Sequence, residues 1–394
     1  MDDIKILKGN IIYTKTKDEF EICEHGYLVC KDGKVEGIYQ TLPFRLGGEP
    51  IEDHGDCLII PGMTDLHIHA PQYTFRGTGM DLELLEWLET NTFPEEAKYK
   101  DVLYANEAYA KFAKNLKHSS TTRACVFGTI HRRSTLVLMD YLERSGLVTM
   151  VGKVNMYKNT LPILTPRFIP SCTDELLDML KMVQMRYQIP VQSHLSENLS
   201  EIEWVKELCP YAEFYGDAYD YFGLFGADAP TVMAHCVYST EEEIQRMKEN
   251  GVYVAHCPES NENLSSGIAP VKRYLEEGLS VGLGSDVAGG STENLFRAMA
   301  HAIQMSKMRW RLVDQKYPAL KSEEAFYMAT KGGGSFFGKV GSFEEGYEFD
   351  AVVLDDSRLE SSRQMSVKDR LERMIYLADE REVKAKYVRG NKII

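Results

Sequence analysis

The feature that most constrains the fold is a regular alternation of short apolar runs with helical patterns through the middle of the chain. Runs rich in β-branched residues predict buried strands, and amphipathic segments between them, such as 173–187 and 241–250, predict helices. The predicted strands lie at 64–69, 121–127, 147–154, 162–168, 190–196, 231–237, 252–258 and 279–286. Strands that alternate with helices pair in parallel, and eight of them predict an α/β fold, a (β/α)₈ barrel of the TIM type.

The two ends of the chain follow a different pattern. Residues 1–60 contain short strands separated by turns, and the Asp-Gly of KDGK (31–34) indicates a tight hairpin. The same style returns near the C-terminus in GYEFDAVVLDD and KAKYVRGNKII. We therefore predict a small composite β domain, sandwich-like, from residues 1–60 plus 341–394. The barrel domain is predicted to span residues 61–340.

One connection does not fit this arrangement. The third and fourth predicted strands are separated only by NMYKNTL, whereas parallel neighbours need a crossover of about a dozen residues or more. Either a helix has been deleted here or residues of the natural chain are missing from the sequence. We expect a chain break, a wide gap or a distorted barrel near residues 156–162.

Composition limits the partners. The 394 residues are 44% hydrophobic and 26% charged, and the net charge of −14 argues against nucleic acid or an anionic membrane as a partner. The acidic N-terminus has no apolar signal core, and no apolar stretch is long enough to span a membrane. The eight cysteines form no Cys-x-x-Cys pair, as expected of reduced thiols. These features favour a cytoplasmic location.

Polar residues that can bind a metal recur at the ends of the predicted strands. Active sites of such barrels form where the carboxyl ends of the strands meet, so these side chains are expected to converge. His67 and His69 share one face of the first strand, because residues i and i+2 of a strand point the same way. The other residues at strand ends are Arg167, Phe168, His194, His235, His256 and Asp286.

Several imidazoles with one carboxylate make a ligand set suited to Zn²⁺ or Fe²⁺. Such a metal lowers the pKa of bound water from about 15.7 to near 7. A carboxylate outside the ligand set is then needed to move protons. Glu197, three residues after His194, is placed for that work.

Together these residues resemble the amidohydrolase superfamily in its mononuclear deaminase branch. The resemblance rests on H67-x-H69, H194-x-x-E197, His235 and Asp286, and it covers nearly the whole chain. Five longer motifs also support this resemblance: LLEWLETNTFP (84–94), TPRF (165–168), SHLSEN (193–198), HCPESN (256–261) and GLGSDVAGG (282–290). The superfamily has a helix after its third strand, which this sequence lacks.

The resemblance implies a role for each site residue. It implies that one zinc per chain, or alternatively Fe²⁺, is held by His67, His69, His194 and Asp286. It implies that Glu197, His235 and Asp286 are catalytic, Glu197 as the proton shuttle and His235 as the holder of the attacking water or the tetrahedral centre. The residues it implies in contact with a purine are Gln72, Arg167, Phe168 and His194.

The implied reaction is hydrolytic removal of the amino group of guanine, which leaves xanthine and ammonia. The expected partners are this small-molecule substrate and a second copy of the chain in a homodimer, with no nucleic acid or membrane. One alternative is another hydrolase of the superfamily, acting on a triazine, cytosine or a modified adenosine. Gln72, Arg167 and Phe168 discriminate these. Another alternative, a barrel without catalytic function, is disfavoured because every expected ligand is present.

The sequence also allows predictions for five further residues. His256 fits a metal site and an ordinary core position equally well. Cys236 and Cys257 each follow a strand-end histidine, so strand alternation predicts that both face the helices. Asp65 is expected to support a ligand histidine or the strand end. Trp87 has helical spacing from Leu84 and is expected in the core.

Overall fold

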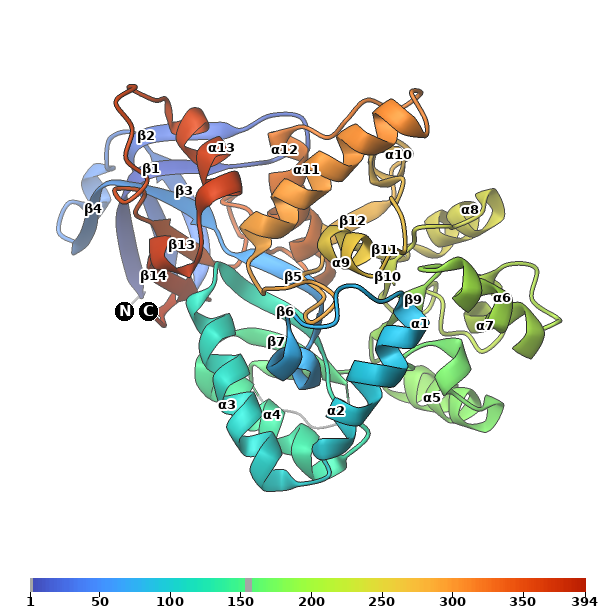
Figure 1. Ribbon diagram of the computed structural model, residues 1–394. Helices are drawn as coiled ribbons and strands as arrows, with labels where there is room; N and C mark the ends of the chain where they lie inside the picture. The colour runs from blue at the N-terminus through green and yellow to red at the C-terminus, as the bar shows by residue number, and fades with distance from the viewer. Residues whose placement is uncertain (1–2, 153–157) are drawn as a thin grey trace.

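A computed structural model describes residues 3–152 and 158–394 and confirms the barrel (Figure 1). Eight parallel strands follow one another around it, and a bridge between Leu164 and Val191 joins the last neighbours. The strands are β5 (Met63–His69), β6 (Thr121–Phe127), β7 (Val148–Gly152), β8 (Thr160–Ile163), β9 (Val191–Leu195), β10 (Thr231–His235), β11 (Tyr253–His256) and β12 (Ser280–Leu283). Their carboxyl ends therefore meet at one rim.

Helices surround the barrel and separate most of its strands (Figure 1). The helices at 173–187 and 241–250 are confirmed as α5 and α8. From α3 onward the helices are α3 (Val102–His118), α4 (Arg132–Ser145), α5 (Asp174–Tyr187), α6 (Leu199–Leu208), α7 (Tyr215–Asp220), α8 (Glu241–Asn250), α9 (Pro258–Asn263), α10 (Val271–Glu276), α11 (Leu295–Leu312), α12 (Ser322–Tyr327) and α13 (Val367–Leu377). Among the described residues, none of these helices combines the length and apolarity needed to span a bilayer.

An additional helical segment follows β5 and leads into α3. It consists of α1 (Leu84–Trp87), a π-helical turn (Leu88–Thr92) and α2 (Phe93–Lys98). In Figure 1 this segment crosses the front of the barrel near the ends of β5 and β6. It thus lies on the side of the barrel where the strand-end residues gather.

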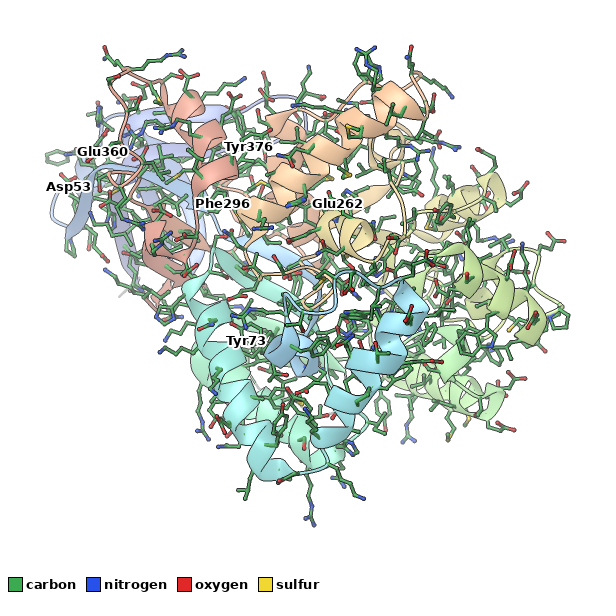
Figure 2. The ribbon with its side chains drawn as sticks, in the orientation of Figure 1. Asp53, Tyr73, Glu262, Phe296, Glu360 and Tyr376 are labelled. Carbon is green, nitrogen blue, oxygen red and sulfur yellow. The ribbon has the colours of Figure 1, made fainter. Side chains whose placement is uncertain are left out.

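Both ends of the chain build a seven-stranded sheet in which blue N-terminal and red C-terminal strands lie together (Figure 1). In spatial order its strands are β15 (Asn391–Lys392), β14 (Val383–Val388), β13 (Ala351–Leu354), β4 (Ile51–Pro61), β1 (Ile4–Tyr13), β2 (Glu21–Lys31) and β3 (Lys34–Tyr39). The hairpin at KDGK is confirmed, with φ of 51° at Asp32 and 78° at Gly33. Exposed Asp53 and Glu360 mark this end of the molecule in Figure 2. The exact domain boundaries stay a prediction.

The predicted fourth strand, 162–168, is corrected: β8 is Thr160–Ile163. Strand-like pairing continues only to the bridge between Leu164 and Val191, and Pro166, which has no backbone N–H, lies beyond it. Arg167 and Phe168 consequently lie in the loop beyond it, yet the Arg167 carbonyl still accepts a hydrogen bond from the His194 N–H (3.2 Å). β7 and β8 pair in parallel, from Thr149–Thr160 onward. The predicted break near 156–162 falls partly on residues 153–157, outside the described residues.

A buried ion pair connects the terminal sheet to the barrel. Arg123 of β6 is 1% exposed, and its Nε and Nη2 donate to the two carboxylate oxygens of Asp350 (2.6 and 3.0 Å). Glu348 accepts a further bond from the same guanidinium (2.6 Å). Because both Arg123 and Asp350 are out of water, the pair fixes the sheet against the bottom of the barrel, away from the strand-end rim.

Candidate active site

The strand-end histidines and Asp286 converge at the rim. His67 and His69 lie in the last three residues of β5, and His194 lies near the end of β9. His235 is the last residue of β10, and Asp286 follows β12. The backbone of His235 and Asp286 has positive φ (72° and 46°). Such a conformation is costly for residues other than glycine and is often found at functional sites. Here it turns both side chains toward the barrel axis.

Four of these residues place ligand atoms around one point. The Nε2 of His69 lies 3.1 Å from Nε2 of His67 and 3.2 Å from Nε2 of His194. Oδ1 of Asp286 lies 3.1 Å from Nε2 of His67 and 3.3 Å from Nε2 of His69. Three nitrogens and one oxygen therefore face each other, in the ligand set preferred by Zn²⁺ and similar metals.

The protonation of these histidines fits a bound cation. Burial lowers the pKa of His67, His69 and His194, so the imidazoles are neutral at pH 7. Nδ1 of His194 lies 2.6 Å from the Arg167 carbonyl, which can only accept, so Nδ1 carries the proton and Nε2 keeps its lone pair. A metal ion bound between these neutral nitrogens would accept their lone pairs and explain why they lie so close together. We therefore identify the cluster as a candidate metal site.

Glu197 and His235 lie next to this cluster. Oε2 of Glu197 is 3.4 Å from Nε2 of His235, and its Oε1 accepts a hydrogen bond from the Ser266 hydroxyl (3.0 Å). Burial raises the pKa of Glu197 to about 7, although His235 counteracts it. Burial alone would lower the pKa of His235, but Glu197 and Asp286 outweigh burial and raise it. A carboxyl that titrates near neutral pH can both take and return a proton.

A cavity opens over the cluster. Gln72, Arg167 and Phe168, the predicted substrate contacts, all line it beside Glu197 and Asp286. Its other lining residues are His69, Leu84, Trp87, Leu88, His194, Glu201, His235 and Leu264. Trp87, expected in the core, is buried as predicted and is also part of the cavity wall. The cavity thus joins apolar walls to a few directed polar groups, as small-molecule sites do.

Three residues missed by the sequence analysis support the predicted ones. Glu96 accepts hydrogen bonds from Gln72 (3.2 Å) and Arg167 (2.7 Å). Glu201 is the N3 residue of a capping box at the start of α6 and accepts the backbone N–H of Glu197 (3.1 Å). Asn261 lies 2.8 Å from Nδ1 of His235 through its Oδ1. The capping pattern Asn-x-x-Glu at 198–201 was visible in the sequence, whereas Glu96 and Asn261 meet their partners only through the fold.

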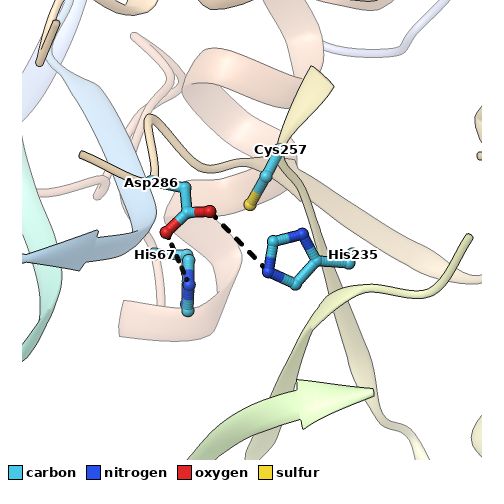
Figure 3. Close-up of side chains that lie close together, drawn as sticks. All are labelled: His67, His235, Cys257 and Asp286. Atoms are coloured by element: carbon cyan, nitrogen blue, oxygen red, sulfur yellow. Dashed lines mark ion pairs between the residues drawn. The ribbon is translucent and has the colours of Figure 1, made fainter. Parts of the chain in front are cut away.

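The prediction that Cys257 faces the helices is wrong. Its Sγ lies within 4.8 Å of ligand atoms of His67, His235 and Asp286 and points into the space between them (Figure 3). The positive φ of His235 reverses the alternation in β10, whereas in β11 it persists and brings Cys257 inward. The same alternation places buried His256 on the opposite face, and burial lowers its pKa to about 3. Cys236 packs in the core shared with the helices, as predicted.

Asp65 binds the backbone at the strand ends and not the imidazole ring of a candidate metal ligand. Its Oδ1 accepts the backbone N–H groups of His67 (3.1 Å) and Ser285 (3.0 Å), and its Oδ2 accepts the Ser285 hydroxyl (2.5 Å). Buried Asp65 therefore ties the end of β5 to the segment that carries Asp286. The two strands that supply most of the cluster are held in register by this one carboxyl.

Comparisons with known proteins identify the family of this chain. The amidohydrolase family matches residues 58–393, and the chain belongs to that family. Guanine deaminase of Dictyostelium discoideum is 37% identical over 444 aligned positions, covering 99% of this chain and 98% of that protein. Guanine deaminase of Escherichia coli K12 is 33% identical, covering 98% and 97%. The crystal structure of guanine deaminase from C. acetobutylicum with bound guanine superposes with a TM-score of 0.96 at 48% identity, covering both chains completely.

The resemblance to the amidohydrolase superfamily is thereby confirmed. The alignment with the Dictyostelium protein extends over 444 positions, more than the 394 residues of this chain. That relative therefore carries residues without a counterpart here, which is consistent with a shortened connection.

Proposed function

We propose that the protein is a guanine deaminase, which hydrolyses guanine at C2 to xanthine and ammonia. The observation that carries the proposal is a cavity that joins the cluster of three histidines and Asp286 to Glu197 and to the polar side chains of Gln72 and Arg167. Relatives with this activity by name align over nearly the entire chain.

The metal is proposed to be one Zn²⁺ per chain, with Fe²⁺ as the alternative, held by His67, His69, His194 and Asp286. When bound, such a metal supplies Lewis-acid activation of water. Three neutral imidazoles and one carboxylate would supply four ligand atoms and one negative charge to this cation, and the Arg167 carbonyl fixes the orientation of His194.

Proton transfer is assigned to Glu197. Its carboxylate takes the proton of the attacking water and delivers it to the ring nitrogen beside C2, so that C2 becomes tetrahedral. His235, held through Asn261, steadies the oxygen that adds to C2. The tetrahedral carbon then expels the amino group as ammonia, with Glu197 again moving the proton. Glu197 fits this double role because burial raises its pKa to about 7.

Substrate recognition is assigned to Gln72, Arg167 and Phe168. Gln72 and Arg167 offer hydrogen bonds to the polar edges of a purine, while the buried ring of Phe168 offers an apolar surface. A site built on such bonds rejects analogues that leave its buried groups unpaired. Hydrolases of triazines, cytosine or modified adenosine share the metal ligands, so these three residues carry the distinction.

The test is a substrate panel with metal-analysed protein. We expect guanine to have by far the highest kcat/KM, ahead of adenine, cytosine and melamine. A preference for any other ring would replace guanine as the substrate, and no turnover of any of them by fully metallated protein would favour the non-catalytic barrel.

The homodimer, the cytoplasmic location and the domain boundaries 1–60 plus 341–394 and 61–340 are also proposals. Light scattering of the purified chain tests the dimer, cell fractionation tests the location, and limited proteolysis near residues 61 and 341 tests the boundaries.

A further inference from the structure

Glu96 contacts two of the proposed substrate residues at once. Its Oε1 accepts a hydrogen bond from Nε2 of Gln72 (3.2 Å), and its Oε2 accepts one from Nη1 of Arg167 (2.7 Å). The Glu96 side chain is only 16% exposed, so water screens these bonds weakly. One carboxylate thus joins two side chains that line the cavity from different parts of the chain.

The contacts of Gln72 determine which end of its amide faces which way. A carboxylate only accepts hydrogen bonds, so the amide nitrogen must point to Glu96. On the other side, the backbone N–H of Ala288 donates to Oε1 of Gln72 (3.2 Å), so the oxygen must point there. Both partners enforce the same orientation. The remaining N–H of Gln72 and the free N–H groups of Arg167 are then left for a ligand.

The π-helical turn at Leu88–Thr92 brings Glu96 into this position. Leu84 and Leu88 line the cavity, and a regular α-helix would continue that face at residue 95. The extra residue of a π turn shifts the face by one position, to residue 96. Glu95 turns away instead and contacts Thr74, Tyr104 and Lys98.

We propose that Glu96 is a positioning residue that sets the specificity of this site for an oxo-purine. Resting on the proposed function, the inference assigns Glu96 no contact with the reacting atoms. By fixing Gln72 and Arg167 as neighbouring donors, Glu96 makes the site match a carbonyl oxygen such as the 6-oxo group of guanine. An amino group at the same place would meet donors and leave them unpaired.

The test compares Glu96→Gln and Glu96→Ala with wild type on guanine and on 2,6-diaminopurine, which carries an amino group in place of the oxo group. Loss of a charge-assisted hydrogen bond corresponds to roughly a 10- to 150-fold change. We expect kcat/KM for guanine to fall by about that factor, mainly through KM, with metal content unchanged. The preference for guanine over 2,6-diaminopurine should fall as well, because only the Ala288 N–H then fixes the orientation of the Gln72 amide.

Glu95→Gln is the matched control, since it alters the same turn of α2 without touching Gln72 or Arg167. It should keep both kcat/KM and the substrate preference within about threefold of wild type, because the partners of Glu95, which are Thr74, Tyr104 and Lys98, do not line the cavity. An equal effect of Glu95→Gln and Glu96→Gln would overturn the proposal and make α2 merely structural.

A double-mutant cycle with Gln72→Ala tests the pathway of the effect. If Glu96 acts through Gln72, Glu96→Ala should cost markedly less in the Gln72→Ala background than in wild type. Independent, multiplicative effects both in this cycle and in the equivalent cycle with Arg167→Met would contradict the inference. The proposed function is judged separately, from guanine turnover by wild type. If wild type lacks turnover, xanthine affinity measured by calorimetry in the same variants still decides the role of Glu96.

Discussion

Replacing Glu197 with glutamine removes a proton acceptor while leaving the size of the side chain almost unchanged. Glu197 is 3% exposed, with one oxygen on the Ser266 hydroxyl (3.0 Å) and the other 3.4 Å from Nε2 of His235. The glutamine can keep the bond from Ser266 through its oxygen. It cannot take a proton from water or return one to the purine. The variant should therefore fold, bind metal and bind purine.

The expected loss of kcat follows from the number of proton transfers. General acid–base catalysis by one group contributes roughly 10²–10⁴-fold. Because Glu197 serves both the attack of water and the departure of ammonia, we expect kcat to fall by about 10⁴-fold or more, or about 5.4 kcal/mol in the barrier. Steady-state kinetics, metal analysis and xanthine binding measure the three quantities separately.

The matched control is Glu203→Gln, on the exposed surface of α6, which should leave kcat unchanged. If Glu197→Gln keeps kcat within tenfold of wild type at full metal content, Glu197 only anchors its loop and the proposed mechanism is refuted. Loss of metal together with activity would make Glu197 part of the metal site instead.

Three other changes test separate parts of the structure. Arg167→Met should lower kcat/KM for guanine by roughly 10- to 150-fold at unchanged metal content, because the carbonyl that holds His194 is retained; equal loss of both would give Arg167 a structural role. Asp286→Ala should abolish both metal binding and turnover, and retained stoichiometric metal would remove Asp286 from the ligand set. Arg123→Met should lower the free energy of unfolding by about 3–5 kcal/mol, since it leaves Asp350 buried without its partner. Chemical denaturation measures this change, and a smaller value would mean that water or another cation reaches Asp350.

The sequence predicted the strands and the convergence of their ends because both depend on local patterns. Apolar runs identify buried strands, and the barrel then forces the strand ends together whatever the details of packing. The sequence alone therefore places five residues at one rim: His67, His69, His194, His235 and Asp286.

The two errors, in the fourth strand and at Cys257, have different structural causes. β8 ends at Ile163, before Pro166, so the predicted fourth strand was placed too late. Cys236 faces the helices as predicted, because the left-handed residue at His235 reverses the alternation in β10. Cys257, without such a reversal, faces the barrel interior. Glu96 could not be predicted, because its two partners are 24 and 71 residues away and the π turn that orients it has no signal in the sequence.

The central claim, that this metal-dependent barrel deaminates guanine, is tested most directly by following products and metal together. Purified protein is stripped with a chelator, reloaded with Zn²⁺ and given guanine. We predict that the stripped protein is inactive, that activity returns in proportion to bound metal up to about one ion per chain, and that xanthine and ammonia appear in equal amounts. Fully reloaded protein that forms neither product from guanine would contradict the account.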